Sequence, residues 1–191
     1  MSVDQKSTKI VTGVVRLSYA KIWEPEADDK GVMKYSTSIL IPKSDKKTIA
    51  DIKNAIEAAK LAGKDKLGRK GGVVKLPLRD GDEERPDDEA YAGYYFLNAS
   101  TTQKPGIVDR AVKPIMDRDE VYSGCYVRAS LNFYAFNVGA NKGIAVGNIL
   151  NLSLVLPAML FNPLFKVMFC LKFNCLSNIN TFCLLKISKF P

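Results

Sequence analysis

Residues 122–137 read YSGCYVRASLNFYAFN, and this stretch decides the fold class. From position 126 onward, apolar and polar side chains alternate with a period of two, which is typical of a β-strand with one buried face. Val127, Leu131 and Phe133 lie on the apolar face, together with two alanines. The polar face carries Tyr126, Arg128, Ser130, Asn132 and Tyr134. The stretch therefore predicts one long strand whose outer face presents aromatic rings and a cation.

Four other stretches predict further strands. Lys9–Tyr19 and Val32–Ile41 are rich in β-branched residues, and the stretch between them, Ala20–Lys30, contains a proline and predicts a loop. Tyr94–Ala99 and a segment that begins at Ile144 predict two more strands. Long irregular stretches separate these later strands, as loops would.

One helix is predicted between the second and third strands. Ser44-Asp45 offers an N-cap, apolar residues recur at helical spacing through Leu61, and Gly63 provides a C-terminal stop. Two strands, one helix and then several strands with long loops favour a small barrel over a doubly wound α/β sheet. We therefore predict a mainly β fold with one α-helix: a five-stranded OB-type antiparallel barrel, followed by an irregular apolar tail.

The chain of 191 residues contains no histidine. Histidine is the commonest metal ligand and the commonest general base near neutral pH, so most hydrolase and zinc-site chemistry loses its central residue. Cys125 has no histidine partner, and we interpret it as a core residue rather than a nucleophile. We therefore predict no catalytic residues, no metal and no cofactor. The polar start, Met1–Lys6, lacks the apolar segment of a signal peptide and predicts a cytoplasmic protein.

The net charge of +8 is unevenly distributed along the chain. All 20 acidic residues lie at or before Glu120, and four of the 28 Lys and Arg residues lie after residue 147. Residues 1–147 therefore carry only half of the net charge. A basic balance of this size is compatible with nucleic-acid binding but does not establish it.

Aromatic side chains beside cations suggest a site for single-stranded nucleic acid. Unpaired bases stack on aromatic rings, with a contribution of about 1–3 kcal/mol per base, and Lys or Arg side chains contact the phosphates. Aromatic residues on barrel strands are more often part of the core, so only some of these rings are expected to be exposed. The predicted DNA-binding residues are Trp23, Lys34, Tyr35, Tyr94, Lys104, Arg110, Lys113, Tyr126, Arg128 and Tyr134.

Seven carboxylates between residues 80 and 89 raise the alternative of a metal-dependent nuclease. Paired catalytic metals need carboxylates that converge from rigid elements. These carboxylates follow one another along one loop, interrupted by Arg85 and Pro86, so a solvated acidic loop is the better interpretation. Such a loop could bind a cation weakly or compete with DNA for a basic groove.

Five segments carry a resemblance to a family of phage and prophage single-stranded DNA-binding proteins. They are RLSYAKIWEP at 16–25, YSTSILIPKSD at 35–45, PLRDGD at 77–82, YSGCYVR at 122–128 and NKGIA at 141–145. The resemblance implies an OB-type barrel that coats unpaired DNA during phage replication and recombination, without catalysis. Single-stranded DNA is the implied partner. Replication or recombination proteins and further copies of the chain are partners that it leaves open.

The resemblance runs from Lys9 to Gly147, and the remaining residues depart from it. Residues 148–191 contain no Gly, Asp, Glu, Arg or Tyr, and 29 of these 44 residues are Leu, Phe, Ile, Asn or Lys. Such a composition is typical of AT-rich DNA translated in an unselected frame. We therefore expect a DNA-binding domain over 1–147 and an atypical apolar tail over 148–191, produced by a frameshift or a misjoined end after Gly147.

Two alternatives remain for this tail. Ile149–Phe165 is a run of 17 residues without a charge, which is at the low edge of the length that spans a bilayer. A genuine anchor would make the membrane a partner and the chain a tethered interaction protein built on the same barrel. The third interpretation is an apolar segment that binds another protein.

Overall fold

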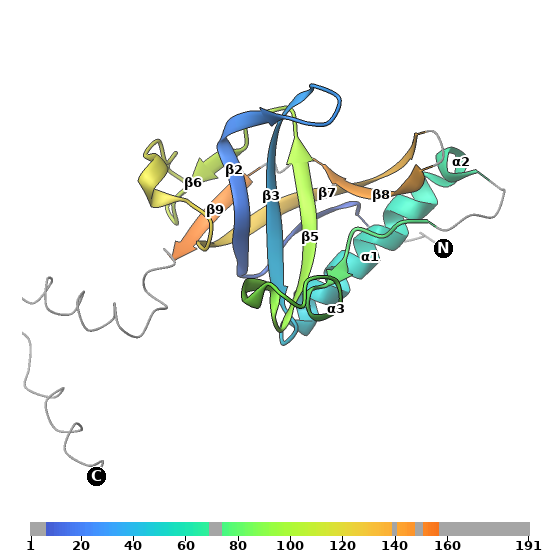
Figure 1. Cartoon of the computed structure of the whole chain (residues 1–191), viewed down its shortest axis with the longest axis horizontal. Helices are drawn as coiled ribbons and strands as arrows, with labels where there is room; N and C mark the ends of the chain where they lie inside the picture. The colour runs from blue at the N-terminus through green and yellow to red at the C-terminus, as the bar shows by residue number, and fades with distance from the viewer. Residues whose placement is uncertain (1–6, 69–73, 139–140, 148–150, 157–191) are drawn as a thin grey trace, which may run out of the picture. The chain divides into compact units, whose positions relative to one another are not determined.

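The computed structural model describes residues 7–68, 74–138, 141–147 and 151–156. These residues form nine strands, three α-helices and two short 3-10 helices (Figure 1). In chain order they are β1 Lys9–Val11, β2 Val15–Ala27, β3 Met33–Pro42, α1 Lys46–Ala62, α2 Lys64–Leu67, β4 Arg79–Asp80, α3 Gly81–Glu84, η1 Glu89–Tyr91, β5 Tyr94–Thr101, β6 Gly106–Val108, η2 Arg118–Glu120, β7 Tyr126–Val138, β8 Asn141–Gly147 and β9 Asn151–Leu156.

Five of the strands close into a ring, which confirms the predicted OB-type barrel. Neighbours around the ring follow the order β2, β3, β5, β8 and β7, and β7 returns to pair with β2. The β5–β8 pair is parallel, whereas the other four pairs are antiparallel. Antiparallel neighbours must alternate in direction, and an odd number of strands cannot alternate all the way round a closed ring. The parallel pair is therefore a consequence of closing five strands.

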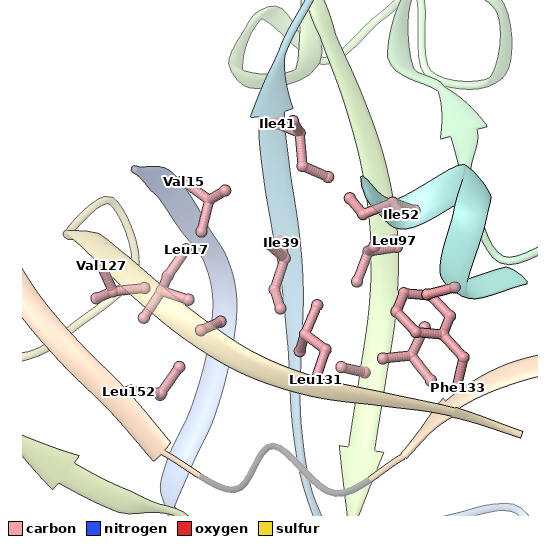
Figure 2. Close-up of a cluster of buried hydrophobic side chains, with 14 of the residues drawn as sticks. Val15, Leu17, Ile39, Ile41, Ile52, Leu97, Val127, Leu131, Phe133 and Leu152 are labelled. Atoms are coloured by element: carbon pink, nitrogen blue, oxygen red, sulfur yellow. The ribbon is translucent and has the colours of Figure 1, made fainter. Parts of the chain in front are cut away.

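The strand β7 is the central element of the barrel, as its alternating sequence predicts. Val127, Leu131 and Phe133 point into the same core as Ile39 of β3 and Leu97 of β5, and Val127 lies toward Leu17 of β2 (Figure 2). All six of these side chains are essentially inaccessible to solvent. β7 pairs with four strands, β1, β2, β8 and β9, so it joins the barrel to the additional strands.

The helix α1 lies against the barrel beside β7 and β8 (Figure 1). Its predicted ends are confirmed: the side chain of Asp45 accepts a hydrogen bond from the backbone N–H of Thr48 at 3.0 Å, and Gly63 caps the C-terminus. Ile52 and its apolar neighbours on the helix enter the main core. A Cβ atom on Gly63 would lie 2.1 Å from the Cβ of Ala135, so the glycine allows the helix to approach β7 closely.

The N-terminal strand differs from its prediction. Lys9–Tyr19 divides into β1 and the start of β2, and the loop predicted over Ala20–Lys30 is wrong because β2 continues to Ala27. The register against β3 shifts between Ser18 and Lys21 and shifts again before Glu26. Regular pairing would not permit a proline within the strand, and these interruptions of the register accommodate Pro25. Local sequence signals of a loop were therefore overridden by pairing with β3.

The sheet continues beyond Gly147, where the sequence predicted the domain to end. β9 pairs with β7 in antiparallel fashion and with β6 in parallel fashion. Leu152 of β9 is fully buried in the main core (Figure 2). The uncharged run at Ile149–Phe165 therefore includes a strand of this sheet, and its other residues lie outside the described part of the chain. None of the helices in the described part is long and apolar enough to cross a membrane.

The turn between β2 and β3 is organised by the carboxylate of Asp28. Its Oδ1 accepts hydrogen bonds from the backbone N–H groups of Lys30 and Val32, each at 2.9 Å. Its Oδ2 accepts a hydrogen bond from Lys34 Nζ at 2.6 Å. The hydrogen bond from Lys34, followed by the bond from Val32, lowers the pKa of Asp28 from 3.8 to about 2.

Truncation of Leu152 tests whether β9 belongs to the folding unit. We expect Leu152→Ala to lower the free energy of unfolding by about 2–5 kcal/mol, because a buried leucine leaves a cavity when it is shortened. Met116→Ala is the control, since this side chain is 81% exposed and its loss should change stability by less than about 0.5 kcal/mol. Denaturant unfolding of the full chain measures both values. Equal, small effects would separate β9 from the core.

Titration of Asp28 tests the β2–β3 turn. We expect an NMR titration midpoint of about 2 for this carboxyl in the unaltered protein and a higher midpoint in Lys34→Met. Lys30→Met is the control, because Lys30 donates to Asp28 only through its backbone. Since folding lowers the pKa, the contribution to stability is present above pH 3.8 and is lost as pH falls toward 2. An unchanged midpoint in Lys34→Met would contradict the ion pair.

Candidate nucleic-acid interface

Residues 79–93, which we call the strap, cross the outer face of β3 and β5. The strap contains β4, α3 and η1, and β4 pairs with β5 through Arg79 and Phe96. Leu40 of β3, Tyr91 of the strap and Phe96 of β5 form a second buried cluster on this outer face. The rings of Tyr91 and Phe96 meet edge to face, with centroids 5.0 Å apart. The strap therefore buries one part of the face and leaves its polar part accessible.

Lys43, which directly follows β3, holds the strap through two ion pairs. Lys43 Nζ lies 2.6 Å from an Asp80 oxygen and 2.7 Å from Asp82 Oδ2. The hydrogen bonds with Asp80 and Asp82 raise the pKa of Lys43, and the bond from Lys43 lowers the pKa of Asp82. Asp82 also accepts a hydrogen bond from the backbone N–H of Gly93 at 2.7 Å. Asp82, near the start of the strap, therefore contacts both Lys43 and Gly93, the last residue of the strap.

Beside the strap, the outer face is hollowed into a groove with a volume of about 350 Å³. Its floor comes from β3 and β5, one wall from β2 and the other from the strap. Ser38 lies opposite Asn98 across the β3–β5 pair, and Ser36 lies opposite Ser100. The groove is lined by Tyr19, Lys21, Ser36, Thr37, Ser38, Arg85, Asn98, Ala99 and Ser100.

Arg85 brings a positive charge to this groove. Its guanidinium carbon lies 4.7 Å from the ring centroid of Tyr91 and 5.6 Å from those of Tyr19 and Phe96. Among the described residues, no carboxylate forms an ion pair with it. Three aromatic contacts orient the guanidinium without neutralising it, so it remains available to an anion.

Tyr19 forms the opposite edge of the groove and is 57% exposed. Its backbone adopts φ of +47°, a left-handed conformation that is uncommon for a residue with a bulky side chain. Its hydroxyl donates a hydrogen bond to Asp88 Oδ2 of the strap at 3.3 Å. An exposed aromatic ring beside a guanidinium combines the two groups that contact a base and a phosphate.

Two of the predicted tyrosines meet at the seam of the barrel. Tyr126 is half-buried and lies opposite Arg16 where β7 pairs with β2. Burial, together with Tyr94, raises the pKa of Tyr126. Tyr94 also packs against the Leu40 cluster beneath the strap. These two rings are therefore close to each other but outside the groove lining.

Four further predicted residues lie outside the groove lining. Trp23 packs against the core and donates from Nε1 to the carbonyl of Val121 at 2.8 Å. Lys104 Nζ lies 5.7 Å from the Trp23 ring centroid. Lys34 pairs with Asp28, and Tyr35 is half-buried opposite Thr101 of β5.

The predicted cations Arg110 and Lys113 lie on the turn after β6. Arg110 donates from Nε to the carbonyl of Val155 at 2.9 Å and so links this turn to β9. The backbone N–H of Lys113 donates to Asp109 Oδ1 at 2.8 Å, and its side chain is exposed. Neither residue lines the groove.

Arg128 and Tyr134 occupy the outer face of β7, as their alternation predicts, and both are exposed. β7 forms the wall opposite β3 and β5, so its outer face points away from the groove (Figure 2). The Tyr134 ring lies against Gly147, where a Cβ atom would come within 2.5 Å of it. The structure therefore divides the predicted residues among several surfaces.

The groove residues Tyr19, Lys21 and Arg85 were missed by sequence reasoning. Tyr19 looked like the end of a strand, and Arg85 looked like an interruption of an acidic loop. A usable signal was present in YSTS at 35–38. The small polar residues Ser36 and Ser38 occupy alternate positions there, in a strand that becomes apolar from Ile39 onward. That pattern marks a polar outer face over a buried inner one.

Four carboxylates of the strap are bound by three different side chains. Asp80 and Asp82 contact Lys43, Glu84 contacts Arg79 at 2.9 Å, and Asp88 accepts from Tyr19. Across the described part of the chain, no group of three or more acidic or cysteine side chains is placed to hold a metal ion. This arrangement gives the nuclease alternative no support.

Comparisons with known proteins identify the family of the chain. A family model described as Enterobacter phage Enc34, ssDNA-binding protein, matches residues 8–155. Protein p50 of Acyrthosiphon pisum secondary endosymbiont phage 1 is 35% identical over 146 residues, which cover 72% of this chain and 78% of that protein. The match to the family model extends past Gly147 and includes most of β9.

Solved structures show the same likeness. The single-stranded DNA-binding protein of bacteriophage Enc34 in complex with ssDNA is 26% identical, with a TM-score of 0.64 over 78% of this chain and 86% of that one. The single-stranded DNA-binding protein encoded by bacteriophage T7 has a TM-score of 0.56 over 78% of this chain and 87% of that one. At 15% identity, the second likeness shows the fold alone. The chain therefore belongs to the family of the single-stranded DNA-binding protein of Enterobacter phage Enc34.

Proposed function

We propose that the chain is a non-catalytic single-stranded DNA-binding protein and that DNA lies in the groove beside the strap. The observation that carries this proposal is the pairing of exposed Tyr19 with Arg85, whose charge has no carboxylate partner among the described residues. In OB-folds, the face of the second and third barrel strands binds oligonucleotides, and these strands are β3 and β5 here. The complex of the Enc34 protein with ssDNA supports the same function.

The chemistry of the groove suits an unpaired strand better than a duplex. A base in a duplex is stacked on both faces, whereas an unpaired base offers a π-face to a single exposed ring such as Tyr19. Arg85 and Lys21 supply charge for the backbone, although Lys21 also pairs with Glu26. Contacts of this kind are independent of sequence to a first approximation, so we infer a protein that coats DNA.

The residues predicted on β7 provide a second candidate surface. Arg128 and Tyr134 are exposed and lie on one strand face, which is the arrangement that stacking and phosphate contact require. A strand that wraps around the barrel could contact both surfaces. We assign the groove the primary role because its cation and its aromatic ring are in direct contact.

Membership of the family supports a proposal about the biological role. We propose that the chain coats unpaired DNA during phage or prophage replication and recombination, in the cytoplasm of the host. Replication or recombination proteins and further copies of the chain are the proposed partners. We also propose that the DNA-binding domain extends through β9 to about residue 156, because β9 supplies Leu152 to the core and the family match ends at residue 155. A tail of separate origin would then begin after β9.

Removal of the Tyr19 ring tests the groove. We expect Tyr19→Ala to weaken binding of a fluorescent oligo(dT) by about fivefold to a hundredfold, the range of one lost stacking contact. Tyr134→Ala is the matched comparison, because it removes an exposed ring from the other face of the barrel. Fluorescence anisotropy at fixed salt measures both affinities. A loss confined to Tyr134→Ala would place the DNA on β7 and refute the groove.

The charge of Arg85 is tested through the dependence of binding on salt. We expect the slope of log K against log[salt] to become shallower by about 0.7 in Arg85→Gln, since one phosphate contact is lost. Arg85→Lys should restore the slope, and Arg128→Gln provides a comparison on the other face. Thermal unfolding of each variant shows whether the strap remains folded. An unchanged slope in a folded Arg85→Gln variant would exclude phosphate contact by this residue.

A further inference from the structure

Three arginines lie around the second buried cluster on the outer face of the barrel. The guanidinium carbon of Arg79 is 4.5 Å from the ring centroid of Phe96, and Arg79 pairs with Glu84. Arg85 reaches the cluster from the strap, and Arg16 lies beside it on β2. Among the described residues, no carboxylate forms an ion pair with Arg85 or Arg16. Two of the three guanidiniums therefore keep a charge that no described carboxylate balances.

The register of β2 places Arg16 on the outer face at the seam of the barrel. Arg16 lies opposite Leu40 of β3 on one side and opposite Tyr126 of β7 on the other. Its neighbours along the strand, Val15 and Leu17, are fully buried in the main core. Because side chains alternate along a strand, the side chain of Arg16 points outward. It is half-buried, so part of it remains accessible to a ligand.

Arg16 lies next to the groove without lining it. Ser18 is the next outward-facing residue along β2, and it lies opposite Ser38, which belongs to the groove lining. A DNA strand that leaves the groove toward the β2–β7 seam therefore meets Arg16 next.

The groups at the seam are hydrogen-bond donors of the kind that phosphates accept. Burial and the neighbouring Tyr94 raise the pKa of Tyr126, whereas the charge of Arg16 acts in the opposite sense. The net shift is upward, so the Tyr126 hydroxyl stays protonated near neutral pH. Arginine and tyrosine side chains both donate hydrogen bonds to phosphate oxygens in DNA complexes.

We propose that Arg16, with the hydroxyl of Tyr126 beside it, binds a backbone phosphate of single-stranded DNA that extends from the groove to the β2–β7 seam. This inference rests on the proposed binding of single-stranded DNA in the groove. It assigns Arg16 and Arg85 to two different phosphates, because Arg85 lines the groove and Arg16 lies outside that lining. Arg79 takes no part in the contact, since Glu84 balances its charge.

The salt dependence of oligo(dT) binding to the full chain tests this second phosphate contact. We expect the slope of log K against log[salt] to become shallower by about 0.7 in Arg16→Gln and by about 1.4 in the double variant Arg16→Gln/Arg85→Gln, because each arginine loses its own phosphate. Arg16→Lys keeps the charge and should keep the slope. Lys53→Gln is the control for net charge, since Lys53 is exposed on α1 and does not line the groove. Fluorescence anisotropy over a series of salt concentrations measures each slope.

Shorter oligonucleotides separate the seam from the groove. As the oligo(dT) is shortened, the effect of Arg16→Gln on the slope should disappear before the effect of Arg85→Gln, because a short strand fills the groove without reaching the seam. Simultaneous loss of both effects would contradict two contacts at successive positions along the strand.

The unaltered protein provides a measurement that needs no variant to fold. We expect the side-chain Nε–H signal of Arg16 to shift in NMR spectra when oligo(dT) is added, since a phosphate then binds the guanidinium. A signal that stays in place at saturating oligo(dT) overturns the contact, and this result decides the question if thermal unfolding shows that Arg16→Gln is not folded.

The outcomes distinguish this inference from the function on which it rests. An unaltered protein that does not bind oligo(dT) refutes the proposed function as well. If a folded Arg16→Gln variant keeps the full slope while Arg85→Gln loses part of it, the seam contact is refuted and binding in the groove stands. An equal change in Lys53→Gln and Arg16→Gln reflects net charge alone and also refutes the contact. A double variant with the slope of the Arg85→Gln single variant excludes a separate phosphate at Arg16.

Discussion

The small aromatic cluster outside the barrel is the interaction on which the candidate site depends. Leu40 points away from the main core, and it would be exposed if Tyr91 of the strap and Phe96 did not cover it. Burial of this cluster holds the strap against β3 and β5. The position of the strap sets where Arg85 meets the three rings and where the groove begins. A small apolar contact thus sets the position of the candidate groove beside it.

The sequence predicted those elements whose signals are local. Alternation along β7 required only that one face be buried, and the ends of α1 required only Asp45 and Gly63. The extension of β2 could not be predicted, because its second half depends on pairing with β3 across a bulge. β9 was hidden for the same reason: a short apolar strand resembles the apolar residues that follow it until its partners are known.

The candidate site was harder to predict than the fold. Strand alternation correctly separated the outward residues of β7 from the inward ones, but a barrel has outward residues on every side. The choice of a candidate binding face depends on which parts of the barrel surface are covered, and here the strap covers part of the outer face of β3 and β5. Arg85 illustrates the difficulty, since its neighbours in the chain are acidic whereas its neighbours in space are aromatic rings.

The parallel β5–β8 pair has a consequence for how the protein forms during synthesis. Closure of the ring requires Ala99 to meet Val146 and Val15 to meet Val127, so strands made early must wait for strands made late. Contacts between such distant parts of a chain slow folding, because the intervening loop loses entropy before the contact forms. A nascent chain that has not yet left the ribosome as far as β8 therefore exposes the apolar inner faces of β2, β3 and β5.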